Sequence, residues 1–488
     1  MNFLKIIISN EIKGFNYDTV VIPFFENKLS LEERGLEFLS SIIEAFSKQN
    51  KFSGKKDEIL AFPYIFENEI KNIVLAGAGK ESEFNLELVR NSSASILKSL
   101  KKLKSQNILV YPFNSSEEYL KNCAEAFLLA DYSFKKYVTS EKESTSINQI
   151  QILSSESESL NSALNEINIL SESIIVARNL VNEPSNIMTP EKLALSTKEL
   201  GDKYGFEVEI LDESKIKSLK MDAFLAVAGG SANKPKLIVM RYHNNKSENS
   251  ILGLVGKGLT YDSGGLSIKP TDSMLTMKSD MAGAAAVVGA VTAAARAGLK
   301  TNITGVIAAC ENSISGTSYR PGDIIPTMAG KNIEIMNTDA EGRLTLADGI
   351  NYIIDIEKAT SVIDIATLTG AALVALGTSV TAVISNNDDF SNFVMDNSKI
   401  ACEKTWRLPA YPEHRELIKS DIADLKNTGG KYAGTITAGM FLLEFSKLKP
   451  MVHLDIAGTS WNDSDTPISP KGGTGEGVKT LYYCAKNF

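Results

Sequence analysis

Short β-rich runs alternate with amphipathic helical stretches along most of this 488-residue chain, and this alternation limits the fold more than any other feature of the sequence. In the first 150 residues, Thr19–Phe24 and Ile108–Pro112 have the composition of buried strands, and Leu86–Leu103 and Glu117–Tyr137 carry apolar residues at helical spacing. Further strands are expected there at Phe3–Ile8, Ile59–Tyr64, Ile73–Ala76 and Gln149–Leu153, with another helix at Leu31–Phe46. We therefore expect the chain to begin with an α/β domain.

A break in the middle of the chain separates this series from a second one. Residues 140–165 are rich in Ser and Glu, and a helix at Ser159–Val181 is expected to connect the two halves before Pro184 and Pro190 end it. After a helix at 191–204 and a strand at 206–211, further strands are expected at Leu237–Arg241, Ile251–Val255, Ile303–Ala309, Ile333–Met336, Val362–Ile365 and Val452–Ile456. We expect an N-terminal α/β domain (1–155), a linking helix (156–182) and a larger C-terminal domain (183–488). Each domain should contain a mixed or mostly parallel sheet flanked by helices.

Charge and composition argue against several classes of protein. Lys and Arg total 51 against 59 Asp and Glu, and the resulting net charge of −8 disfavours nucleic acid as a partner. No stretch reaches the roughly 18 apolar residues that a membrane span needs. The four cysteines lie far apart and suggest no disulfide framework, and no signal peptide is recognised, so a cytoplasmic location is expected. Only three histidines are present, without a CxxC or HExxH motif, which at first argues against a metal site.

Glycine-rich turns offer a nucleotide-binding alternative. Gly77-Ala-Gly79-Lys80 follows an expected strand, but the third glycine of the dinucleotide pattern is replaced by Ser82, so an ordinary turn between strand and helix is favoured. The segment Val255–Gly258 lacks the first glycine of a P-loop, and Asp262–Gly265 lacks the first glycine of a nucleophile elbow.

Charged residues gather instead in glycine-rich segments at or just past the ends of expected strands of the second series. They are Lys257, Asp262, Lys269, Asp280, Asp339, Glu341 and Arg343. Ligands bind at this edge of open α/β sheets, and four carboxylates brought together there need cations beside them. Hard oxygen ligands suit divalent ions such as Mn, Mg or Zn. If the chain is extended at Asp339 and Glu341, their side chains point the same way, as one metal site requires.

Each of these residues also has an ordinary structural interpretation. Taken alone, Asp280 is best interpreted as the N-cap of a helix of small residues, and Arg343 as the surface of a helix over Leu344–Ile354. Lys257 and Asp339 alone would be a solvated loop lysine and a turn residue. Seven charges beside apolar strands make a shared site the better interpretation of the whole set.

The same residues lie in segments that resemble the motifs of a known family. Asn337-Thr-Asp-Ala-Glu-Gly-Arg-Leu344 resembles the signature of the leucyl aminopeptidases, the cytosol aminopeptidase family. The family's other motifs resemble, in the same order, Val255–Gly265, Ser267–Pro270, Met277–Met281, Ala366–Ala371 and His453–Gly458. The resemblance runs from Asn179 onward, and over the first 150 residues it rests on length and the α/β pattern.

This resemblance implies a metallo-aminopeptidase that removes the N-terminal residue, preferably Leu or another apolar residue, from peptides with a free N-terminus. One divalent ion would be bound by Lys257, Asp262, Asp280 and Glu341, and a second by Asp262, Asp339 and Glu341. The ions would be Mn or Zn, with Mg possible in the exchangeable site. Lys269 would stabilise the oxyanion, and Arg343 would hold a bicarbonate that acts as general base. The substrate wall would consist of Met277, Asn337, Ala340, Thr367, Leu368 and Gly370.

The family resemblance also implies a homohexamer, with a possible oligomeric or regulatory role for the N-terminal domain. Two alternatives remain open at this point. Some bacterial members of the family also bind DNA, which makes a DNA-binding or scaffolding role the first alternative, although the acidic balance argues against it. The second is a nucleotide-binding module at Gly77–Lys80.

Overall fold

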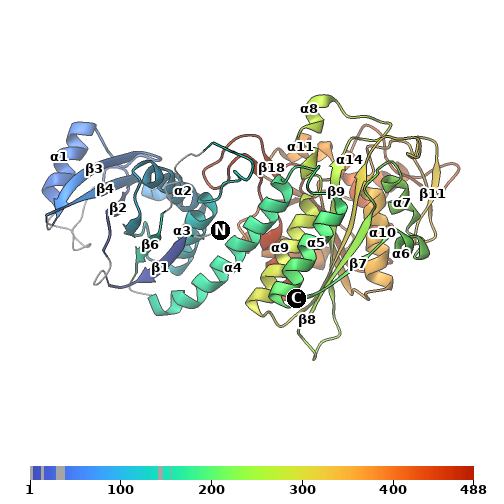
Figure 1. Cartoon of the computed structure of the whole chain (residues 1–488), viewed down its shortest axis with the longest axis horizontal. Helices are drawn as coiled ribbons and strands as arrows, with labels where there is room; N and C mark the ends of the chain where they lie inside the picture. Colours follow the sequence, from blue (N-terminus) through green and yellow to red (C-terminus); the bar gives the residue numbers. More distant parts are fainter. Residues whose placement is uncertain (1–3, 12–15, 29–38, 67, 141–146, 155–156) are drawn as a thin grey trace. The chain divides into compact units, whose positions relative to one another are not determined.

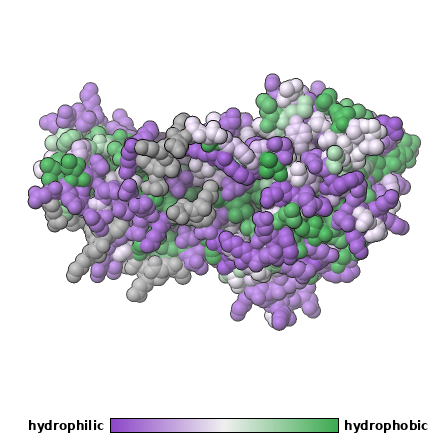
Figure 2. All heavy atoms as spheres, viewed as in Figure 1, coloured by the Kyte–Doolittle hydropathy of each residue, from purple (hydrophilic) through white to green (hydrophobic). Residues whose placement is uncertain are grey.

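The computed structural model describes residues 4–11, 16–28, 39–66, 68–140, 147–154 and 157–488. The described chain divides into two units, one containing residues 1–171 with 464–470 and the other containing 172–463 with 471–488 (Figure 1). Within the described residues, no helix is both long and apolar enough to cross a membrane. The face drawn in Figure 2 is largely hydrophilic, with hydrophobic residues in separate patches.

The first unit is built on a six-stranded sheet. Its strands are β1 (Lys5–Ser9), β2 (Thr19–Phe24), β3 (Ile59–Phe66), β4 (Glu69–Gly77), β5 (Asn107–Val110) and β6 (Gln149–Leu153). Their order is β1-β6-β5-β2-β4-β3, and every neighbouring pair is parallel except the antiparallel pair β3–β4. The helices are α1 (Ser40–Asn50), α2 (Leu86–Lys102) and α3 (Glu117–Ala130), and separate hydrophobic clusters fill the two faces of the sheet.

Two predicted helices of this unit have different limits in the structure. The expected helix at Leu31–Phe46 falls partly outside the described residues, and α1 begins at Ser40 and continues to Asn50. The expected helix at Glu117–Tyr137 ends at Ala130, and the chain turns at Asp131. Tyr132 is buried although it lies outside the helix, which accounts for the apolar residue that made the helix look longer in the sequence.

The helix α4 (Ser157–Asn182), predicted at Ser159–Val181, contains the point at which the chain passes into the second unit. The main strands of that unit are β7 (Glu207–Leu211), β8 (Lys236–His243), β9 (Leu252–Asp262), β10 (Asn302–Asn312), β13 (Ser361–Ala366), β14 (Thr381–Ser385), β15 (Thr405–Arg407) and β17 (Met451–Asp455). They form one mixed sheet in the order β15-β14-β17-β13-β9-β10-β8-β7, in which β17, β13, β9 and β10 are parallel. The expected α/β fold with two sheet-based domains is confirmed.

Two small sheets and a set of helices complete this unit. A small sheet contains β11 (Ile324–Pro326), β12 (Asn332–Glu334) and β16 (Leu425–Lys426), and β18 (Trp461–Asn462) pairs with β19 (Gly472–Gly473). The helices are α5 (Pro190–Tyr204), α6 (Glu213–Ser218), α7 (Asp222–Ala228), α8 (Thr271–Met274), α9 (Ala282–Ala297), α10 (Gly342–Asp355), α11 (Gly370–Leu376), α12 (Asp388–Ile400), α13 (Pro412–Glu416), α14 (Gly434–Leu443) and α15 (Val478–Asn487).

Small residues let two helices approach opposite faces of the central strands. A Cβ at Gly283 of α9 would lie 2.1 Å from the carbonyl oxygen of Ile365, so only glycine fits there. On the other face, a Cβ at Gly349 of α10 would touch Val255 of β9 at 3.2 Å. Because α9 begins after Asp280 and α10 begins after Glu341, this close packing brings both carboxylates to the strand β9.

Candidate active site

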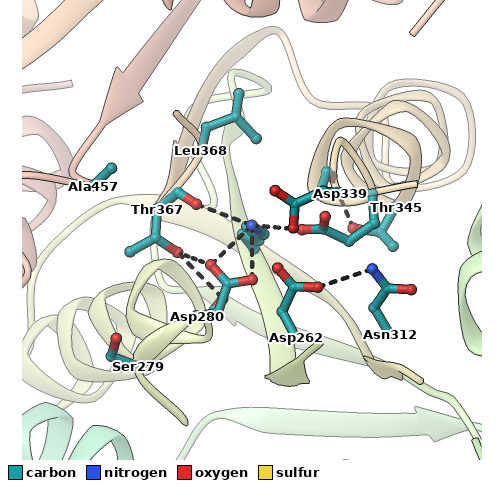
Figure 3. A network of polar contacts seen from close by, with 12 residues as sticks. Asp262, Ser279, Asp280, Asn312, Asp339, Thr345, Thr367, Leu368 and Ala457 are labelled. Atoms are coloured by element: carbon teal, nitrogen blue, oxygen red, sulfur yellow. Dashed lines mark hydrogen bonds and ion pairs between the residues drawn. The ribbon is translucent and has the colours of Figure 1, made fainter. Parts of the chain in front are cut away.

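A cavity of about 590 Å³ opens at the carboxyl ends of the central strands, where the sequence predicted a shared site. Every residue that the family resemblance names as a metal ligand, a catalytic group or part of the substrate wall lines it, namely Lys257, Asp262, Lys269, Met277, Asp280, Asn337, Asp339, Ala340, Glu341, Arg343, Thr367, Leu368 and Gly370. Figure 3 shows Asp262, Asp280, Asp339 and Thr367 converging from separate segments of the chain.

The structure corrects where three of the predicted residues lie. Lys257 and Asp262 were expected after their strand, but β9 continues to Asp262 because it stays paired with β10 as far as Asn312, across an irregularity at Cys310. Asp280 is not a helix N-cap: α9 begins after Met281, and the Asp280 carboxylate accepts hydrogen bonds from side chains in the cavity instead.

The expected extended segment at Asp339 and Glu341 is also wrong. Asp339 lies in a turn, and Glu341 has helical dihedral angles as the residue before α10. Residue Asn337 fixes the turn, because its Oδ1 accepts from the Asp339 amide at 2.8 Å. The two carboxylates reach one cavity through a turn followed by a helix start.

Lys257 is the buried centre of the site. Its Nζ lies 2.9 Å from Oδ1 of Asp280 and 2.8 Å from Oε1 of Glu341, and it donates to the carbonyl oxygen of Thr367 at 2.9 Å. The side chain is almost completely buried, and a Cβ at Gly342 would lie 2.3 Å from its Cε. The absence of a side chain at position 342 therefore leaves room for this lysine.

A second lysine joins the other two carboxylates. Nζ of Lys269 lies 2.7 Å from Oδ2 of Asp262 and 2.5 Å from Oδ1 of Asp339. The turn that leads from β9 to Lys269 uses positive φ angles of 85° at Gly264 and 64° at Gly265, which favour glycine. The second lysine is therefore positioned by a glycine turn immediately after the strand that carries the first.

The site holds more negative than positive charge around its two lysines. Burial, followed by the charge of Asp262, raises the pKa of Glu341 to about 8, and burial raises the pKa of Asp280 to about 6. Burial alone would lower the pKa of Lys257, but the neighbouring carboxylates outweigh burial and raise it above its usual value. If all four carboxylates are ionised, they outnumber the two ammonium groups, and the raised pKa of Glu341 shows that a proton or a further cation must neutralise the surplus.

The donor set fits a divalent cation. One oxygen each from Asp262, Asp280 and Glu341 can lie within 4.8 Å of the others. Among the described residues, Oε2 of Glu341 is buried and has no hydrogen-bond partner. An uncompensated carboxylate oxygen is costly to bury, and hard oxygen donors of this kind suit Mn, Mg or Zn.

Arg343 lies at the start of α10 on another side of the cavity. Its Nη1 donates to the carbonyl oxygen of Asn427 at 2.7 Å, whereas its Nε is buried without a hydrogen-bond partner in the described part of the chain. Burial lowers the pKa of Arg343 to about 10, so the guanidinium remains charged at neutral pH. The cavity therefore contains a guanidinium with unused hydrogen-bonding capacity.

The residues that orient this site include several that sequence reasoning missed. Asn312 ends β10 and donates from Nδ2 to Oδ1 of Asp262 at 2.8 Å. Asp455 ends β17 and accepts from the amide of Leu368 at 3.1 Å and from the hydroxyl of Thr369 at 2.6 Å. Asn312 was missed because the strand that it ends was predicted to stop at Ala309. Asp455 lies inside the motif His453–Gly458 but was assigned no role.

The Gly77–Lys80 turn, the alternative nucleotide site, is packed against the protein itself. A Cβ at Gly77 would lie 1.9 Å from the carbonyl oxygen of Lys55, and the Gly79 amide donates to the carbonyl of Gly54. The close backbone approach that these glycines allow is thus taken up by another part of the same unit.

Comparisons with known proteins agree with the predicted family. The cytosol aminopeptidase family matches twice, its catalytic domain over residues 175–482 and its N-terminal domain over residues 21–141. The chain is 48% identical to a probable cytosol aminopeptidase of Clostridium perfringens over 96% of each chain, and 42% identical to one of Alkaliphilus metalliredigens over 99% of each.

Solved structures show the same similarity. A mutant of the tomato leucine aminopeptidase has a TM-score of 0.88 and 33% identity, over 99% of this chain and 97% of that one. The bottromycin maturation enzyme BotP in complex with Mn has a TM-score of 0.86 and 29% identity, over 96% of this chain and 99% of that one. Together with the buried carboxylate cluster, these matches show that the chain belongs to the cytosol aminopeptidase family of metallo-aminopeptidases.

Proposed function

We propose that this protein is a dinuclear-metal aminopeptidase that hydrolyses the N-terminal residue, preferably Leu or another apolar residue, from peptides. The observation that carries the proposal is the convergence of four carboxylates, two lysines and one arginine on a single cavity. Substrates would be peptides with a free N-terminus.

Two divalent ions would be held by overlapping sets of residues. One set is Lys257, Asp262, Asp280 and Glu341, and the other is Asp262, Asp339 and Glu341. Mn or Zn would occupy them, with Mg possible in the exchangeable site, and Mn is the ion named for the BotP structure. When bound, the ions supply Lewis acidity that activates a water and polarises the scissile carbonyl. Lys257 can act as a ligand only after losing its proton, because an ammonium group has no lone pair.

The remaining charged groups of the chain would act on the substrate. The ammonium group of Lys269 has three donors, and its contacts with Asp262 and Asp339 use two of them. The third would donate to a developing oxyanion beside these carboxylates. Arg343 would hold a bicarbonate through its unused donors, and this anion would supply the general base. Arg343 suits that role because it remains charged despite burial.

The substrate side chain would lie against Met277, Asn337, Ala340, Thr367, Leu368 and Gly370. All six line the cavity, and the wall combines apolar and small residues, which suits side chains of the size of Leu or Met. Thr367 also donates from its hydroxyl to Oδ1 of Asp280 at 2.7 Å, which ties this wall to the carboxylate cluster.

We also propose a cellular location, an oligomeric state and domain roles, which the family resemblance implies. The enzyme would act in the cytoplasm, in keeping with the name of its relatives, and would assemble as a homohexamer. Residues 183–488 would form the catalytic domain, residues 156–182 the linking helix, and residues 1–155 a domain with an oligomeric or regulatory role.

Metal analysis combined with an aminoacyl-substrate assay tests this proposal. Protein loaded with Mn or Zn should release leucine from Leu-p-nitroanilide, and both Asp339→Ala and Glu341→Ala should reduce kcat by at least 100-fold. Glu357→Ala is the matched control, because Glu357 is a buried carboxylate paired with Arg241 outside the cavity. An inactive metal-loaded wild type, or full activity in both site variants, would refute the proposal.

A further inference from the structure

Asn427 belongs to no motif recognised in the sequence, yet the small sheet places it beside the loop that carries Asp339 and Glu341. The strand β16 pairs in parallel with β12, with Glu334 opposite Lys426. Parallel strands end at the same edge of a sheet, so the residue after β16 meets the loop after β12. Asn427 is that residue, and its amide donates to the carbonyl of Glu334 at 3.0 Å.

The side chain of Asn427 holds this loop at both ends. Its Oδ1 accepts from the amides of Met336 at 2.8 Å and Asn337 at 3.3 Å. Its Nδ2 donates to the carbonyl of Asn337 at 2.7 Å and, more weakly, to that of Ala340 at 3.5 Å. The residue is completely buried, and these contacts use both acceptor sites and both donors of the amide. The turn containing Asp339 is therefore bracketed by one side chain.

The main chain of the same residue holds the arginine. The carbonyl oxygen of Asn427 accepts the hydrogen bond that Nη1 of Arg343 donates at 2.7 Å. One residue thus fixes the loop that carries Asp339, two residues of the proposed substrate wall, and the charged group at the start of α10. It touches these groups through hydrogen bonds and reaches the reacting atoms only through them.

We propose that Asn427 is a positioning residue for peptide hydrolysis, which sets the loop 336–340 and Arg343 in register with one another; this inference rests on the proposed function. An asparagine is required because the position needs an acceptor for two amides and donors for two carbonyls. Aspartate would place a second oxygen against the carbonyls, and alanine would leave buried polar groups without partners.

Asn302 provides a matched control for the loss of a buried asparagine that clamps a loop. Its Nδ2 donates to the carbonyls of Asn245 and Glu248 at 2.9 and 3.0 Å, and its Oδ1 accepts from the Asn245 amide at 3.0 Å. Asn302 begins β10, whereas the cavity lies at the other end of that strand, beside Asn312. The two positions are ten steps apart along the strand, which at about 3.3 Å per step is about 33 Å.

The experiment compares Asn427→Ala and Asn302→Ala in the full chain loaded with Mn. We expect Asn427→Ala to lower kcat for Leu-p-nitroanilide by about 10- to 100-fold with KM changed less than threefold, and Asn302→Ala to change both less than twofold. Metal analysis after dialysis against graded Mn should show that Asn427→Ala needs at least tenfold more Mn for half occupancy. This second readout is independent of turnover.

Several results would overturn the inference. One is a folded Asn427→Ala protein whose kcat and Mn occupancy equal those of the wild type. Another is an equal loss of kcat in Asn427→Ala and Asn302→Ala. If Asn427→Ala does not fold, Asn427→Asp, which keeps the acceptor, must show the loss of kcat, and failure of both variants to fold would assign Asn427 a role in folding alone. A wild-type protein that releases no leucine would refute the proposed function and this inference together, whereas an active wild type with an unaffected Asn427→Ala refutes only the inference.

Discussion

Gly342→Ala should slow the enzyme by displacing Lys257, and the structure gives the size of the displacement. A Cβ at position 342 would lie 2.3 Å from Cε and 2.8 Å from Nζ of Lys257, whereas ordinary van der Waals contact begins at 3.4 Å. The lysine must therefore move by about 1 Å. It cannot move freely, because Asp280, Glu341 and the carbonyl of Thr367 hold its ammonium group.

A misplacement of about 1 Å in a catalytic constellation can cost about 100-fold in rate, or about 2.7 kcal/mol in the transition-state barrier. We therefore expect kcat/KM for Leu-p-nitroanilide to fall about 100-fold in Gly342→Ala, with overpacking reducing the unfolding free energy by about 1–3 kcal/mol. The measurements are steady-state kinetics in saturating Mn and thermal unfolding of the same samples.

Gly316→Ala is the control, because a Cβ there meets no atom of the described residues within 4 Å and Gly316 lies outside the cavity. It should leave both activity and stability unchanged. A folded Gly342→Ala protein with kcat/KM within threefold of wild type would show that the position of Lys257 does not limit the reaction, and the account of the site given above would be wrong.

Two further predictions concern buried carboxylates. Asp455→Ala removes the acceptor that fixes Leu368 and Thr369, so kcat/KM should fall about 10- to 100-fold with little change in Mn occupancy; unchanged kinetics would contradict this role. Burial raises the pKa of Asp348 to about 7 in the folded protein, so its contribution to stability is complete below about pH 4 and is lost as the pH rises to about 7. Between about pH 4 and pH 7, the unfolding free energy of the wild type should therefore fall by up to about 4 kcal/mol relative to that of Asp348→Asn. Urea titrations across this range measure both, and a difference between the two proteins that does not change with pH would refute the prediction.

The sequence predicted the chemistry of the site better than its geometry. Lys257, Asp280 and Glu341 were identified because charged residues beside glycines and apolar strands are unusual, and this property is visible in a local segment. The conformation around them was predicted less well. The segment at Asp339 was expected to be extended, and this was wrong. Its shape is set by a hydrogen bond from the Asp339 amide to Oδ1 of Asn337, which strand periodicity does not reveal.

The supporting residues were missed for a different physical reason. Asn427 lies 90 residues from Asn337, its hydrogen-bond partner, and asparagines are common in loops without any such role. Asp455 similarly contacts Leu368 across 87 positions of sequence. Only the pairing of β12 with β16 and of β13 with β17 brings these partners together, and strand order could not be deduced from the pattern of strands.

The position of β17 has a consequence for how the enzyme becomes active during biosynthesis. Although it is the last strand of the large sheet to leave the ribosome, it lies between β14 and β13, near the middle. A nascent chain that ends before Met451 lacks both this strand and Asp455, which holds the turn after β13. The peptidase pocket is therefore completed late in translation, and a prematurely terminated chain would expose an unpaired sheet edge before it could cleave any peptide.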